Sequence, residues 1–169
     1  MDTLERFLNR AWILILCAVL TGGYIYQLLE HEKPCPLCML QRLAMIGVAL
    51  AVLLNLRFGF KEEHYGLAIL VSLFGMGTAL RQIALHVCPQ FSTFGEPVLH
   101  YDLYVWAFIV FICSMLAASI LLIIRIFTND KRVHAAWSFW DKLALALIFF
   151  LAFANTISTL AECGVSACT

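Results

Sequence analysis

The stretch LYVWAFIVFICSMLAASILLIIRIF, residues 103–127, contains a single charged side chain, Arg125. A helix needs about 20 mostly apolar residues to cross the hydrocarbon core of a bilayer, so this stretch predicts a membrane-spanning helix. It shows no alternation of apolar and polar residues that would indicate a barrel strand, and a helix satisfies its own backbone hydrogen bonds in lipid. The segment therefore predicts an all-α membrane protein.

Four other stretches have the same character, at about 11–29, 37–56, 66–85 and 143–161. Hydrophobic residues make up 63% of the chain and charged residues only 13%, whereas soluble domains are about half apolar and about a quarter charged. Residues 11–29 are too long for a signal-peptide core and lack its small-residue ending. The short connections favour antiparallel neighbours. We therefore expect one integral membrane domain over 1–169, with a four-helix core and a fifth C-terminal span.

Lysine and arginine residues are divided unevenly between the two sides of this predicted bundle, and they favour the cytoplasmic side of a membrane. Three would lie on one side, namely Lys33, Arg42 and Arg81. The other eight would lie opposite, namely Arg6, Arg10, Arg57, Lys61, Arg125, Lys131, Arg132 and Lys142. The N-terminus is thus predicted to be cytoplasmic and the C-terminus periplasmic. No basic cluster with interleaved aromatic residues indicates nucleic-acid binding.

Residues 33–38, KPCPLC, place Cys35 and Cys38 at the outer mouth of the second predicted helix. Thiols at this spacing can close a disulfide, and the dipole and N–H groups of a helix N-terminus stabilise a thiolate. Arg42 follows Cys38 by one turn on the same helix face, and a cation inside a membrane marks function. A metal site is the weaker interpretation, because one C-x-x-C supplies only two ligands. The motif predicts redox chemistry beside a lipid-soluble electron acceptor.

A second pair, Cys163 and Cys168, follows the last predicted helix, on the face that also holds the C-x-x-C. Four intervening residues make a loop that a disulfide can close. An exposed disulfide at a chain end suits exchange with a partner protein, and a structural staple or two unpaired thiols are the alternatives. Cys88 is compatible with a spare thiol, a mixed-disulfide intermediate or an unreactive residue.

Other polar and aromatic residues are less specific. Arg81, Gln82 and His86 end the third helix, where polar groups can bind a quinone carbonyl, although Arg81 can also extend to lipid headgroups. Cys17 and Cys113 lie in mid-span and are expected to be small packing residues with inert thiols. Six aromatic residues near span ends are predicted to be interfacial anchors rather than a cofactor site: Tyr24, Tyr26, Tyr104, Trp106, Trp137 and Trp140.

The C-x-x-C with Arg42, at the start of a second membrane helix, resembles the motif of the quinone-linked disulfide bond formation protein B (DsbB) family of bacterial inner membranes. Residues 11–127 are similar to that family in helix order and orientation. The resemblance implies a quinone site that includes Arg42, ubiquinone or menaquinone as cofactor, and a periplasmic thioredoxin-fold dithiol oxidase (DsbA-like) as partner. His86 loosely resembles the family's quinone-side histidine.

The chain departs from the family pattern in its second cysteine pair. Family members with two pairs usually carry the second in the outer loop between helices three and four, and this chain has only Cys88 there. It instead adds a fifth span that ends in Cys163 and Cys168. We expect this tail pair to replace the loop pair.

The sequence thus predicts a quinone-dependent thiol:disulfide oxidoreductase. The partner's thiolate would attack Cys163–Cys168, and the reduced tail would exchange with Cys35–Cys38. Cys38 would then donate to the quinone while Arg42 stabilises charge on the reduced quinone oxygen.

Two alternatives stay open. One is a transporter for soft metal ions, which thiolates select, with Cys17 and Cys113 along its path. The other is a relative that reduces quinone epoxides, which is less favoured because that chemistry normally has its motif late in the chain.

Overall fold

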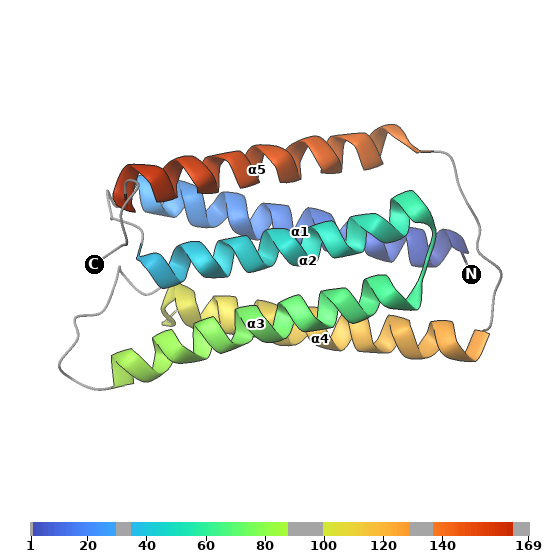
Figure 1. Ribbon diagram of the computed structural model, residues 1–169, viewed down its shortest axis with the longest axis horizontal. Coiled ribbons are helices and arrows are strands. Elements are labelled where there is room, and N and C mark those ends of the chain that lie inside the picture. The colour runs from blue at the N-terminus through green and yellow to red at the C-terminus, as the bar shows by residue number, and fades with distance from the viewer. Residues whose placement is uncertain (1, 30–34, 88–99, 129–136, 164–169) are drawn as a thin grey trace.

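The protein is a bundle of long antiparallel α-helices (Figure 1). This computed structural model describes residues 2–29, 35–87, 100–128 and 137–163. Within these ranges the regular elements are all helices: α1 (Asp2–Leu29), α2 (Pro36–Phe58), α3 (Glu62–Val87), α4 (Leu103–Thr128) and α5 (Phe139–Cys163). All five are long and apolar enough to cross a membrane. The prediction of an all-α fold with five helices long and apolar enough to span a membrane is confirmed.

Helix α2 is the central element of the bundle and contacts each of the other four helices. In the most apolar stretch of α2, 56% of the residues are buried, whereas in the corresponding stretches of the other four helices 22–28% of the residues are buried. Small residues on α2 permit this close packing, since Ala44, Val48 and Ala49 are almost completely buried. The helix that begins with the C-x-x-C motif is therefore the one held on all sides.

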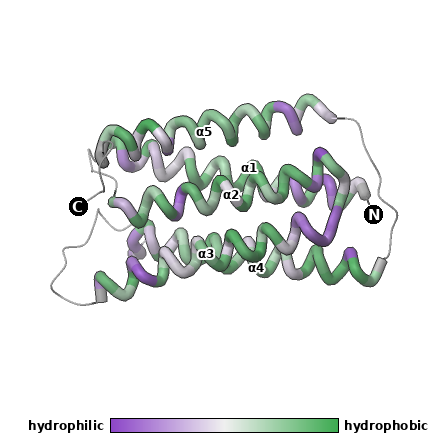
Figure 2. Tube along the Cα trace, viewed as in Figure 1, coloured by the Kyte–Doolittle hydropathy of each residue, from purple (hydrophilic) through white to green (hydrophobic). Residues whose placement is uncertain are grey.

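The outer surface of the bundle is strongly apolar, as expected for a protein solvated by lipid. Phe127, Phe139 and Leu28 are among its most exposed side chains. Figure 2 shows hydrophobic residues along all five helices, with hydrophilic residues gathered mainly toward the helix ends. We call the end that holds the start of α2 and the end of α5 the cysteine end, and the opposite end the far end.

Buried and half-buried polar residues at the far end form one connected group, which we call the far-end cluster: Glu5, Asn9, Asn55, Tyr65 and Arg125. Tyr65 donates a 2.8 Å hydrogen bond to Glu5 and accepts one of 3.0 Å from Asn9. Arg125 lies 3.5 Å from the Glu5 carboxylate, and Asn55 donates to Asn9 at 3.4 Å. These contacts join α1, α2, α3 and α4.

The fifth helix is fixed to α1 by charge at the far end. The Arg10 guanidinium makes a bidentate pair with Asp141 of α5, with Nε–Oδ1 and Nη2–Oδ2 distances of 2.7 and 3.0 Å. Asp141 is only 1% exposed, and such a planar pair is specific in direction as well as favourable in energy. Helix α5 is therefore an integral part of the bundle.

Helices α3 and α4 approach closely where Gly75 faces Phe111. A Cβ atom added at Gly75 would overlap the Phe111 ring, and that ring is 1% exposed. This glycine therefore lets a buried aromatic ring lie directly against the backbone of α3.

The structure extends three of the predicted helices at their starts. Helix α1 begins at Asp2 rather than near residue 11, α3 at Glu62 rather than 66, and α5 at Phe139 rather than 143. The added turns contain polar residues such as Asn9 and Asp141 that bond inside the bundle, so they fold as helix despite their low hydropathy. Cys17 is buried as predicted, but Cys113 is exposed on α4, so the prediction of a packed position is wrong for Cys113.

Candidate functional site

The C-x-x-C motif forms the start of α2. Cys35 is the N-cap residue, with an extended backbone, and Pro36 follows in the first turn. The two cysteines form a disulfide with their Cα atoms 5.2 Å apart. The Cys38 N–H donates to Cys35 Sγ at 3.0 Å, so the sulfur takes the place of the oxygen that usually caps a helix. The reactive bond is thus built into a helix N-terminus.

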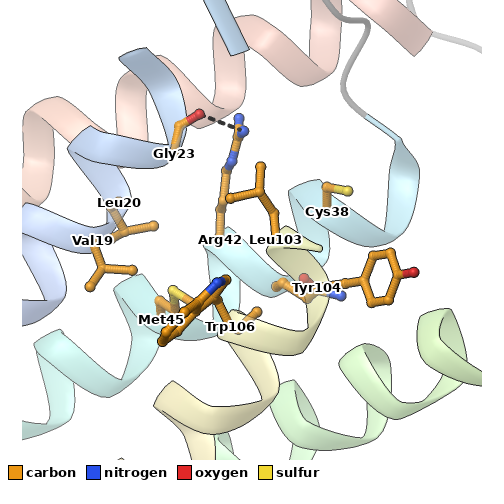
Figure 3. Close-up of a pocket in the computed structure, with 11 residues that line it drawn as sticks. Val19, Leu20, Gly23, Cys38, Arg42, Met45, Leu103, Tyr104 and Trp106 are labelled. Carbon is orange, nitrogen blue, oxygen red and sulfur yellow. Dashed lines mark hydrogen bonds between the residues drawn. The ribbon is translucent and has the colours of Figure 1, made fainter. Parts of the chain in front are cut away.

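A cavity of about 130 Å³ lies next to the disulfide, between α1, α2 and α4. Most of its wall is apolar, and its polar members are Cys38, Gln41, Arg42 and Tyr104. Figure 3 shows Arg42 extending from α2 toward α1, with Cys38 on the same helix and Trp106 across from them. Cys38 and Arg42, predicted to act together, therefore line one cavity.

Arg42 is held on its α1 side by three contacts. Its guanidinium donates to Gln27 Oε1 at 2.6 Å and to the Gly23 carbonyl at 3.5 Å. It also lies 4.3 Å from the centroid of the Tyr24 ring, a favourable cation–π geometry. In the described part of the chain, no hydrogen bond joins Arg42 to either sulfur. The cation lines the cavity from a position fixed by α1 and makes no hydrogen bond to the disulfide within the described residues.

Helix α5 contacts the surroundings of Arg42 and the start of α2 through Asn155. The Tyr24 hydroxyl donates to Asn155 Oδ1 at 3.2 Å, and the Asn155 amide donates to the Met39 carbonyl at 3.4 Å. One side chain thus connects α5 both to the first turns of α2 and to the ring beneath Arg42.

Helix α3 contributes Gln82 on another side of the disulfide. Its Nε2 lies 3.4 Å from both Cys35 Sγ and Cys38 Sγ, and its Oε1 accepts a 2.8 Å hydrogen bond from Gln41. Both glutamines are buried.

The other two predicted quinone contacts on α3 lie outside the cavity wall. His86 stacks on Tyr104, with centroids 4.9 Å apart, and its Nδ1 lies 2.7 Å from the Gln82 carbonyl. Arg81 is exposed. His86 thus adjoins the site through Tyr104, whereas the structure does not bring Arg81 to it.

The tail pair is described only in part. Cys163 ends α5 at the same end of the bundle as the start of α2 (Figure 1). Cys168 and Cys88 lie outside the described residues, so a Cys163–Cys168 disulfide and a role for Cys88 stay predictions.

Sequence reasoning missed several members of the site. Tyr24, Tyr104 and Trp106 were expected to be interfacial anchors, yet Tyr24 supports Arg42 and the other two line the cavity. Gln27 and Gln41 are polar interruptions of apolar runs, and such residues inside membranes usually pair with each other. That signal could have identified them as candidates, although not their partners.

The sequence is similar to known proteins over its first three helices. The family profile described as disulfide bond formation protein DsbB matches residues 5–96. A protein named disulfide bond formation protein B from Chromobacterium violaceum is 37% identical over 89 residues, 48% of this chain and 54% of the relative. Proteins of the same name from Cupriavidus metallidurans and Ralstonia nicotianae are each 32% identical over 95 residues, which is 53% of this chain and 59% or 60% of theirs.

The matches therefore span about half the length of these curated relatives, and no solved structure matches the chain. The matched region contains the C-x-x-C motif, Arg42, Gln27 and Gln82, but not α4 or α5. Because the family profile covers more than half of the sequence, and the disulfide, the cation and the central helix all lie within that match, the chain belongs to the DsbB family of disulfide bond formation proteins.

Proposed function

We propose that this protein oxidises a periplasmic thioredoxin-fold dithiol protein and passes the electrons to a membrane quinone. The observation that carries the proposal is the shared cavity: Cys38, half of a disulfide at a helix N-terminus, and Arg42 line the same small space between membrane-spanning helices. A redox-active bond next to an apolar cavity and a fixed cation suits electron transfer to a lipid-soluble acceptor with polar oxygens.

The residues present fit a quinone ring. An apolar cavity of about 150 Å³ binds benzene in another protein, and the cavity here is about 130 Å³. A quinone ring would enter this space, and ubiquinone and menaquinone, whose head groups are similar in size, are both candidates. The isoprenoid tail would extend beyond the cavity. Arg42 would hold a ring oxygen, because an intramembrane guanidinium is a strong hydrogen-bond donor to an oxygen that gains negative charge.

A bound quinone supplies the capacity to accept two electrons and two protons. The reduced Cys35–Cys38 pair supplies both when its disulfide closes again, so the reaction needs no further reductant. Cys38 is the thiol placed to act on the ring, because it lines the cavity and Cys35 does not. His86 would act indirectly, through Tyr104.

The C-terminal cysteine pair would react with the partner protein. We propose that Cys163 and Cys168 form the disulfide that the partner's thiolate attacks, and that the resulting dithiol reduces Cys35–Cys38 by exchange. The end of α5 and the start of α2 lie at one end of the bundle (Figure 1), which supports this route.

A soft-metal transporter has less support. Such a path needs thiols along the interior of the bundle, and Cys113 is exposed on its outer surface.

The proposed reaction can be tested with purified protein in lipid vesicles. A reduced thioredoxin-fold dithiol protein and a short-chain ubiquinone are added, and loss of quinone absorbance is followed together with thiol loss from the donor. We expect equal molar loss of ubiquinone and donor dithiol. The matched control replaces Cys35 and Cys38 with serine. Equal rates for the control and the original protein would refute the function.

The predicted orientation has its own test. In cells with a permeabilised outer envelope, a membrane-impermeant thiol reagent should label Cys163 and Cys168 after mild reduction, because the Lys/Arg asymmetry places the C-terminus in the periplasm. Labelling only after cell lysis would contradict both the orientation and the role of the tail.

A further inference from the structure

The side chain of Gln82 is the feature of the cysteine end that the proposed reaction leaves unused. It projects from the last turns of α3, is 1% exposed, and does not line the ring-sized cavity. Its Nε2 lies 3.4 Å from each sulfur of the disulfide. A buried amide set equally close to both atoms of a reactive bond is placed to influence that bond.

Gln41 fixes the direction of this amide. Its own Nε2 donates to Gln82 Oε1 at 2.8 Å, which draws the amide oxygen toward Gln41. The Gln82 NH₂ group is then the nearer group to the sulfurs, at 3.4 Å, whereas Oε1 lies 3.8 Å from Cys38 Sγ. Gln41 is 4% exposed and follows Cys38 by one turn of α2. The pair therefore links the helix that bears the cysteines to α3 at the level of the disulfide.

The two sulfurs have different surroundings. Cys35 Sγ also accepts the Cys38 backbone N–H at 3.0 Å. In the described part of the chain, Gln82 is the one hydrogen-bond donor to Cys38 Sγ. Cys38 is also the sulfur that lines the cavity. A negative charge on Cys38 would thus depend on Gln82 for its hydrogen bond.

We propose that Gln82 is a catalytic residue that stabilises the thiolate formed when the Cys35–Cys38 disulfide opens, and that Gln41 is the positioning residue that aims it. An incoming thiolate forms a new S–S bond with one sulfur, the old S–S bond breaks, and its electron pair stays on the other sulfur. Gln82 donates a hydrogen bond to that leaving thiolate without giving up its proton.

The effect on equilibrium follows from the difference between the two states. A disulfide sulfur is a weak acceptor, whereas hydrogen bonds to a charged group are about twice as strong as neutral ones, and a buried site excludes the water that would compete. Gln82 therefore stabilises the reduced form more than the oxidised form. The cysteine pair becomes a stronger oxidant than the same pair without Gln82.

The test uses the redox equilibrium of the cysteine pair, which needs neither quinone nor partner protein. Although the inference rests on the proposed function for its relevance, this measurement can succeed or fail independently of it. Quinone-free full-length protein is equilibrated with graded ratios of reduced and oxidised dithiothreitol. The oxidised fraction of the Cys35–Cys38 peptide is then read by differential alkylation and mass spectrometry.

We expect Gln82→Leu to lower the equilibrium constant for reduction about tenfold, which for a two-electron couple is a shift of about 30 mV toward negative potential. Gln82→Glu keeps the shape of the side chain but places a carboxylate at the sulfurs, so it should shift the potential further in the same direction and recover partly on acidification. Gln41→Leu should give a smaller shift of the same sign.

Thr78→Val is the matched control on α3, because among the described residues the Thr78 hydroxyl bonds only the Gly75 carbonyl of its own helix, and its potential should equal that of the original protein. The alkylation rate of Cys38 against pH gives a second readout, and its profile should move to higher pH in Gln82→Leu. An unchanged or raised potential in either folded Gln82 variant would overturn the proposal. A shifted potential in a protein that fails to reduce quinone would instead refute the proposed function alone.

Discussion

The two ends of the bundle both bury polar side chains, and they differ in what those side chains bond to. In the far-end cluster, Tyr65 bonds to Asn9 and Glu5, Glu5 pairs with Arg125, and Asn55 bonds to Asn9, so the contacts join four helices. At the cysteine end, the polar groups converge on a disulfide and on a cation beside a cavity. Polar groups that satisfy one another can fix helix positions, whereas those that contact a breakable bond or an open space can take part in a reaction.

This difference implies that mutations at the two ends should separate stability from turnover. Substitutions in the far-end cluster should lower the free energy of unfolding and spare the activity of the molecules that stay folded. Substitutions at the cysteine end should lower the activity and leave the free energy of unfolding nearly unchanged.

The largest expected effect is loss of the tail pair. Replacing Cys163 and Cys168 with serine should stop oxidation of the protein partner, because the proposed entry point for electrons is removed. Cys35–Cys38, reduced chemically, should still be reoxidised by quinone, since Cys38 stays beside the cavity. Partner oxidation and quinone reduction are measured separately in vesicles. Normal partner oxidation would show that the C-x-x-C receives electrons directly, and Cys88 would be the next thiol to test.

Breaking the far-end cluster should give the largest loss of stability. Arg125→Met removes the cation that lies 3.5 Å from the Glu5 carboxylate, and removing one partner of a buried ion pair costs about 3–5 kcal/mol. Thermal or denaturant unfolding in detergent measures the loss. Quinone reduction per folded molecule should stay within about twofold of the original rate. A drop in turnover much greater than the loss of folded protein would show that the two ends are coupled.

Arg42→Ala should lower quinone turnover while leaving stability nearly unchanged. The substitution removes a guanidinium that we expect to hold a quinone oxygen, and hydrogen bonds to charged groups contribute about 1.5–3 kcal/mol. The kcat/KM for ubiquinone should therefore fall about tenfold to a hundredfold. The unfolding midpoint should change little, because the lost contacts to Gln27 and Gly23 are partly exposed. Unchanged quinone kinetics would remove Arg42 from the site.

Asn155→Leu should have the smallest effect and tests whether α5 supports the cysteine end. It removes the partner of the Tyr24 hydroxyl and the donor to the Met39 carbonyl, a loss of about 1 kcal/mol for a neutral hydrogen bond. We expect a few-fold rise in the KM for ubiquinone. Thr156→Val is the control, because within the described ranges its hydroxyl bonds only the Ala152 carbonyl of α5. Equal values for the two variants would leave α5 with no part in positioning Arg42.

The number and kind of helices could be predicted from the sequence because apolar length alone specifies a membrane span. The starts of α1, α3 and α5 could not, since hydropathy does not reveal that Asn9 or Asp141 finds a partner on a distant helix. Their helical turns are stabilised by tertiary contacts rather than by transfer into lipid.

Only part of the functional site could likewise be predicted from the sequence. Cys35, Cys38 and Arg42 are close in sequence, so helical spacing was enough to place them on one face. Gln82 meets Gln41 and the sulfurs only because of how α3 is rotated against α2, and a single sequence carries no direct record of that rotation. The contact of Tyr24 with Arg42 could not be predicted for a related reason, because an aromatic residue near a span end has the same local signature whether it faces headgroups or a half-buried cation.

The sulfur that caps α2 also makes the start of this helix a reporter of the redox state. The Cys38 amide is held by Cys35 Sγ, an atom whose covalent partner changes whenever the disulfide opens. A thiolate at that position would cap the helix more strongly, and a mixed disulfide that draws the sulfur outward would leave the first turn uncapped. Amide hydrogen exchange at Cys38 would then distinguish the oxidised, reduced and mixed-disulfide forms without any label on the thiols.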